Sequence, residues 1–154
     1  MPLDRAWIAA HVPHRGAMCL LEEVLEWDAT TIRCRASSHR SAANPLRAHG
    51  QLGIACGIEY AAQAMAVHGA LLARPGEPQR AGVLASARGV KFAVARLDEL
   101  GDDLVATASF VHGDAAMVLY DFSVSGAGRV LLSGRATIAF ARPSPAPDAK
   151  RDER

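Results

Sequence analysis

The fold is decided by residues 50–69, which read G-Q-L-G-I-A-C-G-I-E-Y-A-A-Q-A-M-A-V-H-G. Apolar and small residues recur there every three or four positions, which predicts one long helix that starts between Gly50 and Gly53 and ends near Gly69. One acid, Glu59, lies among the alanines of this helix. An ionised carboxylate that is removed from water is costly unless it is paired or protonated. We therefore expect Glu59 to have a partner, to face a cavity or to take part in chemistry.

Segments that alternate polar and apolar residues flank this helix on both sides. A short helix over residues 5–11 and two strands over 17–27 and 30–37 are expected before it. Four strands are expected after it, in an antiparallel meander, over residues 81–95, 104–112, 117–125 and 130–140. This order predicts an α+β protein in which an antiparallel sheet wraps around one long central helix, the hotdog arrangement, which usually dimerises.

Length and composition exclude several classes of protein. Its 154 residues suffice for one domain, which we expect over 1–141, followed by a disordered, proline-rich tail over 142–154. The net charge of +1 without a basic stripe makes nucleic acid a poor expectation. Three separate cysteines, no apolar run of about 18 residues and no secretion signal predict a cytoplasmic protein without membrane contact. The six histidines lack metal-site spacing, so we expect no metal.

Three groups of motifs, spread over residues 8–140, occur in an order that points to a known family. They are V-P-H-R over 12–15 with M-C-L-L-E-E-V behind it, the segment from His39 through Asn44-Pro45 to Glu59 and Gln63, and G-V-K-F over 89–92 followed by G-D-D-L. Together they resemble the bacterial 3-hydroxyacyl-ACP dehydratases of fatty acid synthesis. The motifs N-P-L-R and G-I-E-Y-A-A-Q-A-M-A-V-H-G look like the divergent dehydratases of aryl polyene gene clusters.

The resemblance implies an enzyme that eliminates water from a 3-hydroxyacyl thioester and gives the trans-2-enoyl thioester. It implies no cofactor, and it implies an acyl carrier protein that presents the acyl chain on phosphopantetheine. In this family the base and the acid come from opposite subunits, so the resemblance also implies a dimer. We expect a homodimer, with a heterodimer with another hotdog protein as the alternative.

Dehydration needs a base at the α-carbon, an acid at the departing hydroxyl and a hydrogen-bond donor at the thioester carbonyl. We expect His39 to be the base, because a neutral imidazole accepts a proton near pH 7. Desolvation in an apolar helix would favour the protonated form of Glu59, which suits the acid. Free N–H groups around Gly50 and Gly53 are expected to bind the carbonyl, and Gln63, one turn after Glu59, to orient the acid.

Other roles remain open for the charged residues around this segment. His49, next to the expected helix start, is the rival catalytic histidine. Glu59 is alternatively a structural acid neutralised by Arg40 or Arg47. Those two arginines and Lys91 are alternatively contacts for the acidic carrier protein.

Two further histidines are given structural roles. His14 is expected to fix a loop by hydrogen bonding, as the P-H motif does in the family that the chain resembles. His68 is expected near the end of the long helix, where it would interact with free carbonyls.

Two other functions fit the same fold. A thioesterase would use Glu59 to activate water on an acyl-CoA or acyl-ACP. A non-catalytic hotdog subunit would bind acyl chains or pair with an active dehydratase. The kind of product separates these hypotheses, because a dehydratase forms an enoyl thioester, a thioesterase releases free acid and a scaffold subunit forms neither.

Overall fold

A computed structural model describes residues 2–77 and 82–141 of the chain. The elements before the long helix are α1 (Arg5–His11), β1 (Glu23–Trp27) and β2 (Thr31–Ala36). The long helix is α2 (Gly57–Leu72), and β3 (Gly82–Phe92), β4 (Leu104–Gly113), β5 (Met117–Gly126) and β6 (Arg129–Phe140) follow it. The tail expected over 142–154 lies outside the described residues. Among the described residues, no helix is long and apolar enough to span a membrane.

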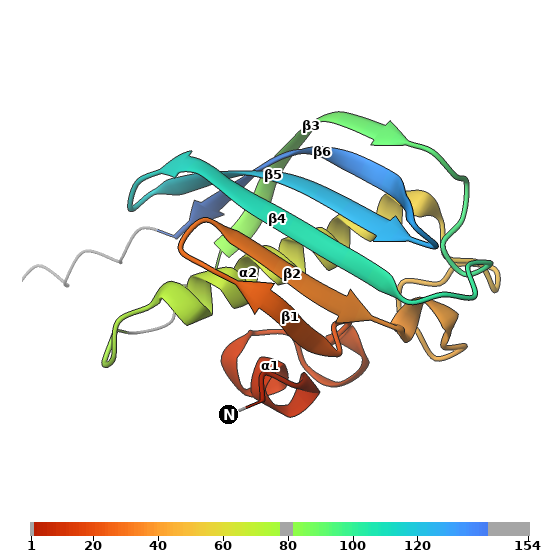
Figure 1. Ribbon diagram of the computed structural model, residues 1–154, viewed down its shortest axis with the longest axis horizontal. Helices are drawn as coiled ribbons and strands as arrows, with labels where there is room; N and C mark the ends of the chain where they lie inside the picture. The colour runs from red at the N-terminus through yellow and green to blue at the C-terminus, as the bar shows by residue number, and fades with distance from the viewer. Residues whose placement is uncertain (1, 78–81, 142–154) are drawn as a thin grey trace, which may run out of the picture.

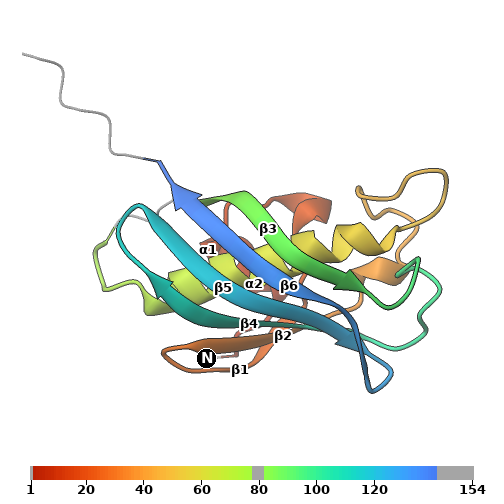
Figure 2. The ribbon, with the colours of Figure 1, turned by 90° about the horizontal axis from the view of Figure 1, so that it is seen from above.

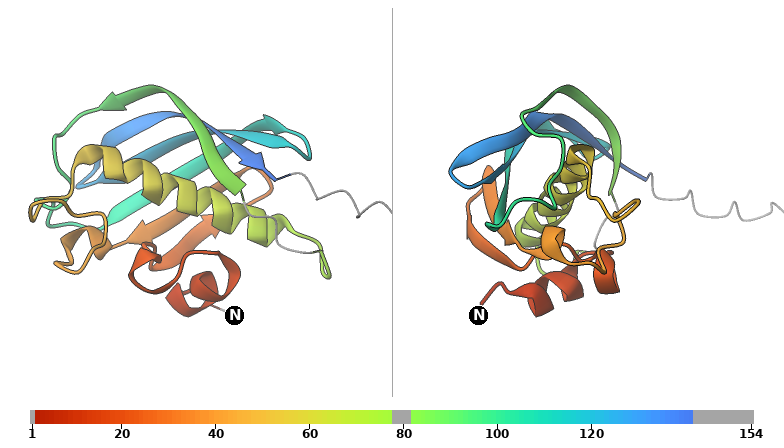
Figure 3. Two further views of the ribbon diagram at one scale, coloured as in Figure 1. Left: turned by 180° about the vertical axis from the view of Figure 1, so that it is seen from behind. Right: turned by 90° about the vertical axis from the view of Figure 1, so that its right-hand side faces the viewer.

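The strands form one antiparallel sheet of six strands in the order β1-β2-β4-β5-β6-β3 (Figure 1). Seen from the end, this sheet curves around α2, as the sequence predicted (Figure 3). The view from above shows α2 lying beneath the strands along their concave face (Figure 2). The predicted wrapping of a sheet around one helix is therefore confirmed.

The predicted order of the last four strands is wrong, because they do not form a simple meander. β3 pairs with β6 at one edge of the sheet, and β4 pairs with β2 instead of β3. The connection over residues 93–103 carries the chain across the sheet past the start of α2. Backbone hydrogen bonds hold this connection there, from Ile54 N to the Ala95 carbonyl at 3.0 Å and from Leu97 N to the Leu52 carbonyl at 2.8 Å.

The long helix starts later than the sequence pattern indicates. Gly53 forms an isolated bridge with Arg96, and a short 3-10 helix over Ile54–Cys56 precedes the first α-helical residue, Gly57. The predicted start at residues 50–53 is wrong because that backbone pairs with the 93–97 connection. Gly57 lies close to β6, because a Cβ there would overlap the end of the Leu132 side chain, which would have to shift.

Fully buried side chains of α2 face the sheet and form the centre of the core. Tyr60, Ala61, Ala64 and Val67 have no exposed surface, and they pack in one cluster with buried residues of β2, β4, β5 and β6. Because these side chains are mostly small, the helix axis lies close to the strands. Other positions on α2, such as Ala62, Ala66 and Gly69, are half-exposed or exposed, and they border the groove described next.

Candidate functional site

A groove of about 380 Å³ runs between one side of α2 and the strands of the sheet. The helix provides one wall, and the first residues of β3 and β5 with the last residues of β4 and β6 provide the other. Its lining is mainly apolar and includes small helix residues at Ala62, Ala66, Gly69, Ala70 and Ala73. Titratable side chains from the segment after α1 and from the first turn of α2 also line it. A groove of this kind accommodates a long apolar ligand beside groups that can transfer protons.

Glu59 lines this groove from the first turn of α2, and its side chain is exposed. The expectation of a carboxylate buried in the helix is wrong for this chain, because the outer side of α2 is covered by no other described element (Figure 3). Neither candidate arginine neutralises Glu59 within the described residues. Arg40 pairs with Asp103 at 2.6 Å, and Arg47 donates to backbone carbonyls and lies 3.9 Å from Asp98.

His14 and His11 both line this groove, and His14 is close enough to Glu59 for the charge of that carboxyl group to affect its pKa. Its side chain is half-buried, and its Nδ1 has no hydrogen-bond partner among the described residues, contrary to the expected loop-fixing bond. Burial lowers the pKa of His14, and the negative charge of Glu59 partly opposes that shift. A neutral imidazole next to a carboxyl group is an arrangement that can move protons at neutral pH.

His39 lies elsewhere. Its ring is fully buried, and its Nε2 donates to the carbonyl of Leu100 at 3.1 Å. Burial lowers the pKa of His39, against the opposing effect of hydrogen bonds to the backbone of residues 100 and 102. His39 does not line the groove, so within one chain the structure does not bring His39 and Glu59 into one cavity.

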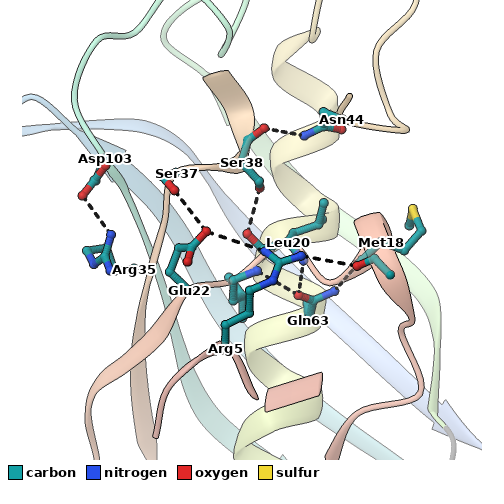
Figure 4. Close-up of polar contacts among 12 residues, drawn as sticks. Arg5, Met18, Leu20, Glu22, Arg35, Ser37, Ser38, Asn44, Gln63 and Asp103 are labelled. Atoms are coloured by element: carbon teal, nitrogen blue, oxygen red, sulfur yellow. Dashed lines mark hydrogen bonds and ion pairs between the residues drawn. The ribbon is translucent and has the colours of Figure 1, made fainter. Parts of the chain in front are cut away.

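The Asn-Pro motif behind His39 braces a loop instead of lining the groove (Figure 4). The Asn44 amide donates to the Ser38 carbonyl and to the Tyr60 hydroxyl, both at 3.0 Å. Ser38 Oγ donates to the Leu20 carbonyl at 2.8 Å, so the Tyr60 hydroxyl must be the donor in its 2.7 Å contact with Ser38. The motif therefore ties the 38–47 loop to α2 and to the segment before β1.

Gln63 is also engaged in holding this segment (Figure 4). Its Oε1 accepts from the backbone N–H groups of Leu20 and Leu21 at 2.8 and 3.1 Å, and its Nε2 donates to the Met18 carbonyl at 2.8 Å. Because the amide is fully buried and paired at both ends, the expected hydrogen bond from Gln63 to Glu59 is wrong. These bonds also explain why the strand expected over 17–27 is regular only from Glu23.

The remaining predicted residues lie in the loop before α2. Gly50 and His49 adopt positive φ angles of 73° and 53° in a turn, and Gly53 pairs with Arg96. All three of these predicted residues are exposed, and none lines the groove.

Aromatic residues of the sheet line the distal part of the groove, and sequence reasoning missed them. Tyr120 of β5 and Phe110 of β4 lie edge to face, with ring centroids 5.8 Å apart. The Tyr120 hydroxyl is 2.7 Å from Nδ1 of His68, a fully buried residue of α2 that the sequence placed among the free carbonyls at the helix end. No local pattern marks these residues, because strand pairing and the crossing of α2 bring them together.

A family model described as ApeP-like, ApeP dehydratase, matches residues 6–149. The dehydratase heterocomplex ApeI:P from Xenorhabdus doucetiae is 24% identical, with 92% of each chain covered and a TM-score of 0.76.

Two other solved structures show lower similarity. The PaaI protein from the phenylacetic acid degradation operon of E. coli is 16% identical over 88% of each chain, with a TM-score of 0.59. A mutant thioesterase from Pseudomonas aeruginosa is 15% identical, covers 77% of this chain and 80% of its own, and has a TM-score of 0.55. These structural likenesses establish a shared fold. Comparison with curated proteins gives no match.

Proposed function

Because the chain belongs to the ApeP-like dehydratase family, whose model matches residues 6–149, we propose that it dehydrates a 3-hydroxyacyl thioester to the trans-2-enoyl thioester. One observation carries this proposal: two groups that can transfer protons, His14 and Glu59, line the same long, mainly apolar groove. An acyl chain lying in the groove would place its thioester end beside those groups. The family also supports a role in aryl polyene or related lipid synthesis.

The proposed reaction uses one base and one acid. Nε2 of neutral His14 removes a proton from the α-carbon, and the electron pair of that C–H bond forms the α,β double bond. The C–O bond at the β-carbon breaks as the departing hydroxyl takes a proton from the Glu59 carboxyl group, which receives that proton before each turnover, and the hydroxyl leaves as water. The imidazolium and the carboxylate that result are restored when a proton returns from His14 to Glu59, directly or through water.

A second arrangement keeps the base that the sequence indicated. There, His39 of one subunit would face Glu59 of another, as in the family that the motifs resemble. It requires Nδ1 of His39, which has no hydrogen-bond partner among the described residues, to become accessible, while Nε2 keeps its bond to the Leu100 carbonyl. We favour His14 because it already lines the groove with Glu59 in one chain.

The edge of the sheet supports a second hotdog subunit as partner. Among residues 2–77 and 82–141, β3 pairs only with β6, and it exposes 66% of Val83 and 51% of Phe92. An edge strand with large exposed apolar residues is typical of a surface that another chain covers. The structurally similar ApeI:P protein is a heterocomplex, which favours a related but different chain as the partner.

We infer that the substrate is presented by an acyl carrier protein. Of the three basic residues expected to meet it, Arg40 and Arg47 are engaged in internal bonds. Lys91 is exposed on β3 and is the one of the three that we propose as a contact.

The test is to incubate the chain, alone and with a partner hotdog subunit, with 3-hydroxyacyl-ACP and to measure enoyl and free-acid products by mass spectrometry. We expect enoyl product, and we expect His14→Ala and Glu59→Gln each to lower its rate by about 100-fold or more, as for loss of a general acid or base. The control is His112→Ala, an exposed histidine outside the groove. If His39→Gln loses dehydratase activity and His14→Ala keeps it, the base is His39 and not His14. Free acid would show a thioesterase, and no product with either preparation would show a scaffold subunit.

A further inference from the structure

In the half of the groove that lies far from Glu59, one lining residue of α2 is a glycine, Gly69. Gly69 lies ten residues after Glu59, which places it about 15 Å further along the helix axis. A Cβ built at this position meets no atom within 4 Å, and its backbone angle is not the left-handed one that favours glycine. Neither packing nor backbone geometry requires glycine here, and alanine is the better helix former. The effect of the glycine is to leave space in the groove.

On the sheet side of the groove, Tyr120 is held by contacts near the same turn of α2. Tyr120 is hydrogen-bonded to His68, the neighbour of Gly69, and Phe110 packs against the Tyr120 ring. Nε2 of His68 lies 2.8 Å from the Asp28 carbonyl, which can only accept, so this nitrogen carries the proton. Nδ1 must then accept from the Tyr120 hydroxyl. Both ring nitrogens of His68 are thus paired, and one of these bonds holds the Tyr120 hydroxyl.

We propose that the space left by Gly69, in the groove that Tyr120 also lines, sets the longest acyl chain that the groove accepts. This inference rests on the proposed function. Gly69 lines the groove and a Cβ there meets no atom within 4 Å, so a larger side chain at residue 69 would take up space in the groove. Long acyl chains would meet that bulk, whereas short chains would end before reaching it.

The experiment compares kcat/KM for a series of 3-hydroxyacyl thioesters of increasing length. We expect Gly69→Leu to lower the value for the longest substrates by at least about tenfold and to leave the shortest nearly unchanged, since groove contacts of this size discriminate by such factors. Ala62→Leu, three residues from Glu59, is expected to impair every length. Ala9→Leu, an exposed small residue of α1 outside the groove, is the matched control.

The outcomes separate this inference from the proposed function. Turnover by the wild type with an unchanged length profile in Gly69→Leu would overturn the inference alone. A changed assembly mass for Gly69→Leu would also overturn it, because residue 69 would then contact a subunit. If the wild type turns over no length, the proposed function fails. Binding of non-reactive acyl-pantetheine amides of the same lengths then provides the test, with loss of only the long ligands expected in Gly69→Leu and equal binding contradicting the inference.

Discussion

Single hydrogen bonds decide which histidines of this chain are available for chemistry. His39 and His68 each donate through Nε2 to a backbone carbonyl and are fully buried. His14 has no such anchor among the described residues, and it lines the groove with Glu59. The chemical type of a residue is therefore a weaker guide to its role than the partners that its ring nitrogens already have.

The hydrogen bond between the single residues His68 and Tyr120 is expected to contribute to stability. Tyr120→Phe leaves Nδ1 of His68 buried without a donor, which is expected to lower the free energy of unfolding by about 1–3 kcal/mol. Urea denaturation measures this loss. Because both partners are then removed, the double variant Tyr120→Phe with His68→Leu is expected to lose less than the sum of the single variants. Additive losses would show that the two side chains do not interact.

At the scale of elements, α2 organises the segments that precede it. Gln63 holds the backbone of residues 18–21, and Tyr60 joins the brace formed by Ser38 and Asn44. One face of the helix thus packs on the sheet, and polar side chains from the same helix secure two loops. The remaining face is left for the groove.

Removing the Gln63 amide is expected to loosen the loop before β1. Gln63→Leu leaves two backbone N–H groups and one carbonyl without their partner, so the free energy of unfolding should fall by at least about 1–3 kcal/mol. Hydrogen exchange should also become faster at the amides of Leu20 and Leu21. Gln51→Leu changes an exposed glutamine and serves as the control. Unchanged exchange at both amides would show that other contacts hold the loop.

For the whole molecule, the buried histidines link stability to pH. Burial lowers the pKa of His14, His39 and His68 below the value of 6.5 that an exposed histidine has. Below pH 6.5 the unfolded chain therefore binds more protons than the folded chain, and the folded state is progressively disfavoured. Carboxylates such as Asp103 have pKa values below their usual range and titrate at lower pH.

We therefore expect the free energy of unfolding to decrease as the pH falls from 7 to 5, by at most about 1.4 kcal/mol per pH unit for each of the three histidines. Urea denaturation at several pH values measures the slope. His68→Leu should reduce it, whereas His112→Gln, at an exposed position, should leave it unchanged. A stability that does not change between pH 7 and 5 would contradict the prediction.

The sequence alone determined the layout of one long helix among short strands. Periodicity and turn residues are local properties, so residues 50–69 and the alternating segments after them predicted the wrapped sheet. The local environment of Glu59 was predicted less well. Its alanine neighbours suggested burial, but burial depends on which side of α2 the sheet covers.

Only the tertiary structure decided the strand order and the composition of the site. β3 reaches the far edge because the 93–103 connection pairs with residues 52–54, more than forty positions away in the chain. In the same way, His39 is bonded to Leu100, His68 to Tyr120, and His14 is placed beside Glu59. Such contacts depend on the free energy of the whole packed molecule, which no local pattern of residues expresses.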